Sequence, residues 1–344
     1  MPSSKSTTSA AFAALRKARL LKDDTILRCN IGPFNVSAIR STHLQHKAQT
    51  KWDWNNLETK RWSACSNANL LIASFLSGEE RIRARMTMGN QYTGVTEAIA
   101  VGEVRGSLEE ALPNLKENVQ LTVERILYGA NQPFASTVTL PIRSQMNEIE
   151  NTQLVYQEYL NKSDQGQCSR ILLIDRKEVK DGNTEEEKSK WWSGGIIVQS
   201  MGHYGMKSIA SDGDSHEKEK EVIAAFSEWW DYEQEKDHTS TSFFGSNFME
   251  MSSEVGVASA LQNMLSSSPL GLYEMNDVRV RSCDFHCRCT KEQFLSKINL
   301  LPVGDIVSIM NDIDAGSTNS LDLTCHHCNK NYSMYYEDLE GMLK

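Results

Sequence analysis

The chain has 344 residues, enough for one large domain or two smaller ones, and its formal net charge is −9. This acidic balance disfavours a nucleic-acid partner, because proteins that bind phosphate backbones depend on Lys and Arg contacts. The sequence contains no run of about 18 apolar residues, so we expect neither a membrane-spanning helix nor a membrane partner.

Residues 1–22 hold five basic side chains and no acidic one. Phe12, Leu15 and Arg19 fit one basic amphipathic helix, which is typical of an organelle transit peptide. Residues 1–23 are therefore read as a transit peptide that indicates the mitochondrion. The alternative is a disordered tail on a cytoplasmic protein. The sequence has no secretory signal, so we expect an intracellular, reducing compartment.

Residues 24–211 alternate strand-like and helix-like pieces. Residues 26–31 and 35–39 are predicted strands of a hairpin that turns at Gly32. Between Asn55 and Ser77 the apolar residues recur with the spacing of a helix, which Gly78 ends and which we expect to pack beneath a sheet. Further strands are predicted at residues 82–88, 98–104, 138–142, 171–174 and 196–199.

These elements predict the α+β fold class, with an α/β sandwich-like core domain over residues 24–211. Residues 175–192 interrupt it with eleven charged side chains of mixed sign. That composition is typical of a solvated loop or a loosely held helix, and we assign it no function.

Residues 212–282 are predicted to form an acidic, metastable helical linker. Residues 212–237 contain ten acidic side chains and three lysines. The apolar side chains of this segment fall on one helical stripe, and a second stripe follows it, so both helices would be held by side-chain packing and would have low local stability. The two stripes contain Val222, Phe226, Trp229, Trp230, Val257 and Leu261.

Two cysteine pairs lie close together in the last quarter of the chain, and 35 residues separate them. The pairs are Cys287 with Cys289 and Cys325 with Cys328. Zinc prefers four soft ligands at tetrahedral corners, which two turns with two thiolates each can supply. Residues 283–344 are therefore predicted to form a small zinc-binding domain that holds one Zn²⁺ per chain.

The residues around these pairs are compatible with a compact module. Thr290 with Gln293 forms a capping box for a helix that carries Phe294 and Ile298. Residues 321–325 alternate as a strand that leads into the second pair. Two alternatives remain open: a purely structural zinc ribbon that never releases its metal, and a histidine ligand. The candidate histidines are His286, His326 and His327, although four cysteines already satisfy zinc.

Four thiolates around one divalent ion leave a net charge of about −2. We expect Arg288, Lys291 and Lys330 to moderate it. Thiolates are also the form that oxidants attack, and a disulfide between cysteines one residue apart is strained and easily reduced. The spacing is thus compatible with reversible oxidation.

The remaining cysteines are assigned no redox role. Cys283 is a spare thiol near the predicted site and is expected to be a passenger. Cys29, Cys65 and Cys168 are expected to be small buried side chains.

The chain resembles the heat-shock-protein-33 family of redox-regulated holdase chaperones. The resemblance covers residues from about Asp24 to the carboxyl end. Its motifs are Phe285–Glu292, Cys325–Tyr332, Val104–Gly106, Tyr159–Gln165 and Gly194–Gln199. The charged inserts are longer than that pattern, and Asp164 stands where the family usually has Glu.

The resemblance implies an ATP-independent chaperone that prevents aggregation of unfolding proteins under oxidative stress. Cys287, Cys289, Cys325 and Cys328 would be the zinc ligands. Oxidation would release zinc and form the disulfides Cys287–Cys289 and Cys325–Cys328. The linker would then unfold and bind unfolded clients, and a homodimer of the oxidised form is a further implication.

If the zinc fold supplies the docking surface of the linker, its melting exposes the two apolar stripes, and clients would bind there. The alternative is a constitutive binding protein with a structural zinc ribbon. An enzyme, such as a thiol oxidoreductase that uses Cys325 and Cys328, is disfavoured because the motif lacks a thioredoxin-like βαβ context.

Overall fold

The computed structural model describes residues 24–111, 117–130, 132–163, 168–179, 189–201, 214–235, 261–263, 265–314 and 319–342. Among the helices in these ranges, none has the length and apolar character needed to cross a bilayer. The predicted transit peptide and its alternative fall on residues 1–23, outside the described residues, and stay predictions.

The first part of the chain contains two sheets and three helices. Its elements are β1 (Thr25–Ile31), β2 (Phe34–Arg40), α2 (Thr42–Trp52), α3 (Asn56–Ala73), β3 (Arg81–Met88), β4 (Tyr92–Ile99), β5 (Glu103–Glu109), β6 (Asn118–Ile126), β7 (Phe134–Pro141), α4 (Glu148–Ser163), β8 (Ser169–Val179) and β9 (Ser189–Ser200).

The second part begins with helices, continues with two strands, and ends in a small module of helices and strands. Its elements are α6 (Asp214–Glu235), the 3-10 helix η2 (Pro269–Leu272), β10 (Met275–Ser282), β11 (Asp284–Phe285), α9 (Lys291–Ile298), α10 (Val303–Asp314), β12 (Leu321–Thr324), β13 (Asn331–Met334) and α11 (Tyr336–Glu340).

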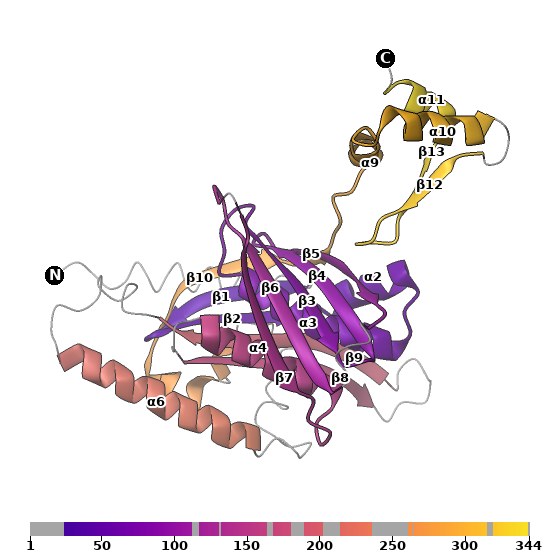
Figure 1. The fold of residues 1–344 in the computed structure, drawn as a ribbon. Helices are drawn as coiled ribbons and strands as arrows, with labels where there is room; N and C mark the ends of the chain where they lie inside the picture. Colours follow the sequence, from indigo (N-terminus) through magenta and orange to yellow (C-terminus); the bar gives the residue numbers. More distant parts are fainter. Residues whose placement is uncertain are drawn as a thin grey trace.

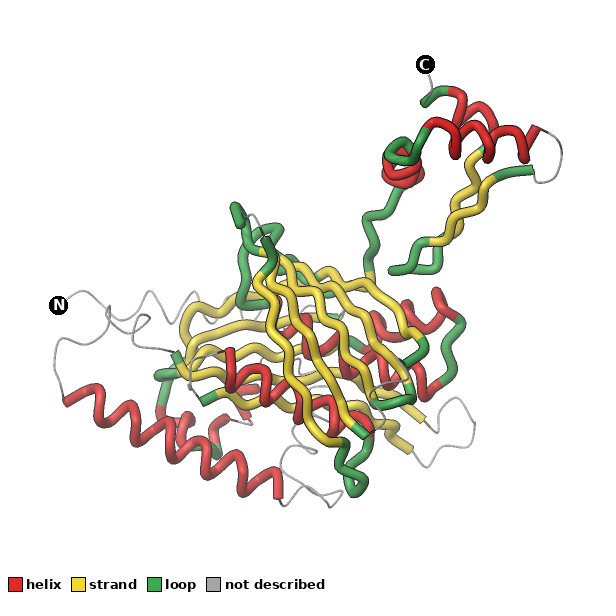
Figure 2. Tube along the Cα trace, viewed as in Figure 1, coloured by secondary structure: helices red, strands yellow, loops and turns green. Residues whose placement is uncertain are grey.

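Two sheets enclose a layer of helices, which confirms the α+β fold class (Figures 1 and 2). One sheet has the strand order β10-β1-β2-β9-β8, and the other has the order β11-β5-β4-β3-β6-β7. Helices α3 and α4 contact both sheets. The helix predicted beneath one sheet therefore lies between two.

Local sequence explains the first hairpin and helix α3. Gly32 has a φ of 52°, which permits the turn between β1 and β2. The side chain of Asn55 caps α3 and Glu58 completes a capping box. Most residues of α3 after Lys60 are buried because sheets cover it on both sides. The predicted hairpin and helix are confirmed.

The prediction of one strand over residues 98–104 is wrong. Strand β4 ends at Ile99 and β5 starts at Glu103, and the two pair antiparallel. Gly102 turns the chain with a φ of 100°, and a Cβ there would collide with the carbonyl oxygen of Ser282. The turn needs this glycine, which the apolar pattern conceals.

Part of the insert at residues 175–192 is strand rather than loop or helix. Strands β8 and β9 stay paired from Asp175 opposite Ser193 to Val179 opposite Ser189. Their ladder uses backbone groups, so charged side chains do not end it. Residues 180–188 lie outside the described residues.

Helix α6 confirms the predicted amphipathic helix but docks elsewhere than predicted. Phe226 and Trp230 are fully buried, and the Phe226 ring lies 4.8 Å from that of Phe34 on β2. The docking surface of α6 is therefore the outer face of the five-stranded sheet, not the zinc fold. Alternate residues of β1 and β2 make that face apolar, including Leu27, Ile31 and Val36.

Other stripe residues share this packing. Val222 and Trp229 lie at the edge of the same apolar cluster, and Leu261 is buried within it. Val257 lies outside the described residues.

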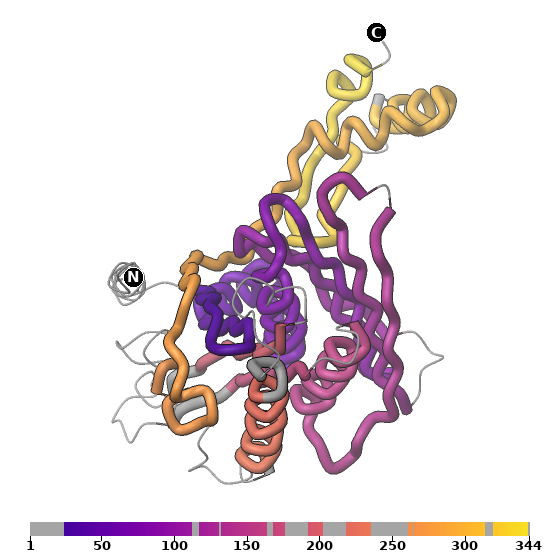
Figure 3. Tube along the Cα trace, turned by 90° about the vertical axis from the view of Figure 1, so that its left-hand side faces the viewer, coloured from indigo at the N-terminus to yellow at the C-terminus, as the bar shows by residue number. Residues whose placement is uncertain are grey.

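The end of the expected helical linker is a strand. Strand β10 pairs antiparallel with β1, and β11 pairs parallel with β5, so this segment joins both sheets. Its trace runs along one side of the molecule toward the carboxyl-terminal module (Figure 3). Main-chain pairing with distant strands explains why helical periodicity did not reveal it. The division at residues 212–282 and 283–344 stays a prediction.

Candidate metal centre

The structure brings four cysteine thiols together at one point. The Sγ atoms of Cys287, Cys289, Cys325 and Cys328 all lie within 4.8 Å of one another. Sγ of Cys287 is 3.8 Å from Sγ of Cys325, and Sγ of Cys289 is 3.4 Å from Sγ of Cys328. All four thiols are free. They could together hold one metal ion.

This spacing fits a tetrahedral thiolate site. Sulfur atoms about 2.3 Å from a central zinc would lie about 3.8 Å apart. Among the described residues, the cluster contains these four cysteines and no histidine. The alternative with a histidine ligand therefore gains no support from the geometry.

Tight local structure presents each pair of thiols. Cys287 and Cys289 precede α9, which Thr290 caps as predicted by accepting a hydrogen bond from the Gln293 amide. Cys325 and Cys328 lie on the turn between β12 and β13. The Asn329 amide donates to the Cys325 carbonyl at 2.9 Å, and Asn329 has a left-handed φ of 56°. Each turn thus aims two sulfurs at one point.

A small apolar core supports the two turns. The hydroxyl of Tyr332 donates to the carbonyl of Cys289 at 2.7 Å, and its ring lies 5.1 Å from the ring of Phe294. Buried side chains of α9, α10, β13 and α11 complete this core: Ile298, Ile306, Met310, Tyr332, Met334 and Leu339.

Backbone hydrogen bonds tie the thiol cluster to the six-stranded sheet. The His286 amide donates to the Val104 carbonyl at 2.9 Å, and the Gly106 amide donates to the His327 carbonyl at 3.0 Å. A Cβ on Gly106 would come within 2.8 Å of the Trp62 ring. The close packing of β5 against α3 therefore requires glycine at this position, whose amide also bonds to the His327 carbonyl.

Arg105 connects the thiols to a buried carboxylate. Its guanidinium donates to Sγ of Cys287 at 3.8 Å and to Glu97 at 2.6 Å. Glu97 is 1% exposed and also contacts Arg81 and Arg83. Burial opposes ionisation of Glu97, but Arg105 and Arg83 outweigh it and hold the pKa of this carboxyl below its ordinary value.

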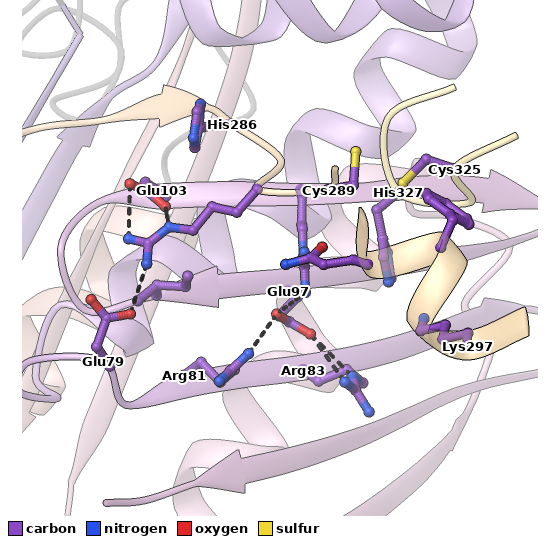
Figure 4. Close-up of a pocket in the computed structure, with 15 residues that line it drawn as sticks. Glu79, Arg81, Arg83, Glu97, Glu103, His286, Cys289, Lys297, Cys325 and His327 are labelled. Atoms are coloured by element: carbon purple, nitrogen blue, oxygen red, sulfur yellow. Dashed lines mark hydrogen bonds and ion pairs between the residues drawn. The ribbon is translucent and has the colours of Figure 1, made fainter. Parts of the chain in front are cut away.

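Residues of the six-stranded sheet and of the cysteine-bearing module together line a cavity of about 390 Å³, with Cys289 and Cys325 on its wall (Figure 4). Solvent therefore has a path to the thiols of Cys289 and Cys325. Its charged lining consists of five cationic side chains and three glutamates: Arg81, Arg83, Arg105, Arg288, Lys297, Glu79, Glu97 and Glu103.

The cations predicted to moderate the thiolates have other partners. Arg288 pairs with Glu103 at 2.7 Å and with Glu79 at 2.9 Å. Lys291 pairs with Asp338, and Lys330 lies over the ring of Tyr332. Arg105 from β5 takes this place instead. Only tertiary structure brings it there.

Of the three cysteines expected to be buried, Cys29 and Cys65 match the expectation and Cys168 does not, while the role of Cys283 stays a prediction. Cys29 and Cys65 are buried, and burial raises the pKa of each to about 12. Cys283 is also buried, outside the cluster, with a raised pKa whose main cause is burial. Cys168 is only half-buried, and its thiol lies 2.8 Å from the hydroxyl of Ser227 on α6.

Sequence reasoning missed Glu97, Gly106 and the role of Arg105. The motif Val104–Gly106 belonged to the family resemblance, but it carried no chemical assignment. Glu97 lies within a strand, and nothing in its neighbours indicates three arginine partners.

Comparisons with known proteins agree with this architecture. A family model described as "Hsp33 protein" matches residues 28–335. The 33 kDa chaperonin of Streptococcus uberis is 22% identical over 330 residues, which cover 91% of this chain and 95% of that protein. The 33 kDa chaperonin of Streptococcus agalactiae is 22% identical over 334 residues, which cover 91% and 94%.

A solved structure has the same fold. It is the crystal structure of the 33 kDa chaperonin (heat shock protein 33 homolog) of Thermotoga maritima. The TM-score is 0.62 at 15% sequence identity, and the match covers 93% of this chain and 98% of that chain.

Proposed function

The chain belongs to the Hsp33 family, and we propose that it is a redox-regulated holdase chaperone that works without ATP. Its clients are unfolding proteins under oxidative stress, and its switch is a four-cysteine zinc centre. The observation that carries this proposal is the thiol cluster. It follows closely in the chain after β10, the edge strand of the five-stranded sheet on which α6 packs.

In the reduced state, Cys287, Cys289, Cys325 and Cys328 hold one Zn²⁺. The bound ion contributes the folding energy of the small module, about 10 to 16 kcal/mol in comparable modules. Strand β11 and the bonds from His286 and Gly106 dock that module on β5. The module then restrains β10 at its carboxyl end.

Oxidation removes the ligands. Cys287 pairs with Cys289 and Cys325 with Cys328, and each pair of thiolates gives two electrons to one hydroperoxide. That hydroperoxide takes up two protons as its O–O bond breaks, and it is reduced to an alcohol and one water, or to two waters where it is hydrogen peroxide. Disulfide sulfurs no longer ligate, so zinc is released and the module loses its fold.

Loss of the module weakens the segment that covers the five-stranded sheet. The chain passes from η2 through β10 and β11 into the zinc module without another helix or strand between them. At the start of this segment, η2 contacts α6. When α6 lifts off, the sheet face around Phe34 and Val36 and the stripe with Phe226 and Trp230 become accessible. These apolar surfaces would hold clients, and the acidic side chains of the linker would keep the complex soluble.

One oxidant titration tests the proposal. Zinc release, followed with a metallochromic indicator, should rise together with suppression of client aggregation. A variant with Cys287→Ser and Cys289→Ser should lose this dependence on oxidant, whereas Cys168→Ser, outside the cluster, should behave like the unaltered protein. Full suppression before zinc release would contradict the proposal.

The second candidate is a constitutive binding protein with a structural zinc ribbon. The two-core construction favours it, because the module has an apolar core of its own. In that case zinc would persist under oxidant and suppression of client aggregation would not change.

The oxidised form is further proposed to be a homodimer. Sedimentation of both redox forms tests this.

A further inference from the structure

Strand β10 is held on the sheet edge by a weaker ladder than its neighbour. Strands β1 and β2 pair through seven consecutive residues. The pairing of β1 with β10 has a register shift between Arg28 and Asn30. Two residues of β10, Asp277 and Val278, there oppose the single residue Cys29. Such a bulge interrupts the main-chain hydrogen bonds.

The bulge also contains an unfavourable backbone conformation. Asp277 has a φ of 49°, in the left-handed region that costs residues with a side chain some free energy, although Asp tolerates it better than most. Detachment of β10 would relieve this conformation.

Like charges oppose each other across the same pair of strands. Arg28 on β1 lies directly opposite Arg279 on β10. Like charges in this position destabilise strand pairing. Burial first, and then Arg279, lowers the pKa of the Arg28 guanidinium. Asp277 forms an ion pair with Arg279 at 2.9 Å within β10, and its charge offsets only part of the effect of burial and Arg279, so the pKa of Arg28 stays lowered.

The side chains of β10 alternate between half-buried apolar residues and exposed polar residues, as in any extended segment with one face on a core. Val278 and Val280, with Met275 before the bulge, pack against the apolar cluster beneath α6. Asn276, Asp277 and Arg279 are exposed. Strand β10 thus presents an ordinary alternation of apolar and polar residues to the sheet.

Both anchors of β10 belong to the proposed switch. Only the segment from Cys283 to His286 separates β10 from the first cysteine of the cluster. At its other end, Leu270 of η2 is buried in the cluster that α6 covers. Loss of the zinc module and of α6 would therefore leave only two polar contacts to hold β10: the interrupted ladder and the hydrogen bond from Arg281 to the Ala100 carbonyl, among the described residues.

We propose that β10 occupies the place of a client strand, and that its departure opens the edge of β1 to an extended segment of an unfolding protein. This inference rests on the proposed function and names the site where clients bind. Strand β1 stays in the sheet through β2, and its freed N–H and C=O groups would pair with any extended backbone.

This mode of binding explains which clients fit. Main-chain hydrogen bonds require no particular sequence, and apolar residues at alternate positions would replace Val278 and Val280. The partner is therefore an extended, alternating segment, as unfolding β-rich regions present.

A peptide pair tests the proposal on the full chain. The probe is a labelled peptide of about eight alternating Thr and Val residues. Its control has the same sequence with N-methyl groups on alternate residues, which remove the donors that a ladder needs. The oxidised, zinc-free protein should bind the probe at least about tenfold tighter than the control, and the reduced protein should bind neither.

Hydrogen exchange locates the bound probe. Amides in residues 25–31 should exchange faster after oxidation and slow again by about tenfold when the probe binds. Equal binding of probe and control, or probe binding without protection of β1, would overturn the proposal. If the oxidised protein suppresses aggregation while β1 remains protected, this inference fails but the proposed function stands.

A variant pair provides an independent check. Arg279→Glu places an opposite charge across from Arg28 and should lower probe binding by the oxidised protein about threefold to tenfold. Arg279→Lys keeps the repulsion and should bind like the unaltered protein. Zinc release should be equal in all three, and equal probe binding would count against the role of β10.

Discussion

Arg105 lies with its guanidinium 3.8 Å from Sγ of Cys287. The same side chain is 22% exposed and contacts the buried Glu97 at 2.6 Å. One arginine of β5 therefore joins the thiol cluster to the charged side chains that surround Glu97 on the six-stranded sheet. A cation beside a thiolate stabilises it and lowers its nucleophilicity.

Arg105→Gln should make the centre more sensitive to peroxide. Without the cation, the Cys287 sulfur is more nucleophilic and the module docks less firmly, so zinc should be released about threefold to tenfold faster. Stopped-flow mixing with a zinc indicator measures this rate. Arg85→Gln is the control, because Arg85 on β3 pairs with Glu109 and lies outside the cavity. Unchanged release in Arg105→Gln would contradict the assigned contact.

Glu97→Gln should destabilise the protein at neutral pH by about 3 kcal/mol, because it leaves neighbouring arginines without their buried carboxylate. The folded-state pKa of Glu97 lies below its ordinary 4.5, so its contribution is present above that pH. It is lost as pH falls through the folded-state pKa, and the two proteins should then converge. Urea unfolding across this pH range measures the difference.

Glu109→Gln provides the comparison for that measurement. Glu109 is 41% exposed and has one arginine partner. Its replacement should change the free energy of unfolding by less than about 1 kcal/mol. A similar loss in both variants would show that burial of Glu97 is not the cause.

Gly106→Ala should shift β5 against α3 and β4 and thereby weaken the bond from its own amide to the His327 carbonyl of the cysteine-bearing module. A Cβ at this position would meet the Trp62 ring and the Val95 carbonyl, and the φ of 150° adds backbone strain. We expect a loss of about 3 kcal/mol, measured by thermal unfolding of the zinc-loaded protein. Gly129→Ala is the control, since its φ is 77° but nothing lies within 4 Å. Equal losses would mean that the clash does not occur.

Phe226→Ala should partly activate the reduced protein. Phe226 is fully buried between α6 and β2, and its truncation should cost about 3 to 5 kcal/mol of helix docking. Aggregation suppression should then appear without oxidant while zinc stays bound. Tyr232→Ala on the same helix is the control, because Tyr232 is 56% exposed. If Phe226→Ala stays inactive until zinc leaves, α6 is not the cover of the client surface.

Sequence reasoning succeeded where the signal is local. The hairpin at Gly32 and the capped helix at Thr290 depend on residues within one or two turns of the chain. It failed at residues 98–104, where an apolar run continues across a hairpin. It also failed for β10, whose polar and apolar residues alternate across a bulge and whose partner lies far away in sequence.

The sequence by itself indicated which four cysteines could hold a metal ion, because ligand type and short spacing decide which turns can present two thiols. Tertiary structure alone decided what these turns touch. It placed Arg105 beside Cys287, with Glu97 as the second partner of Arg105. It also packed α6 on the five-stranded sheet and paired β10 with β1. Each of these contacts joins segments far apart in the chain. Several apolar faces and strand edges could serve as partners, and only the packing of the whole fold decides between them.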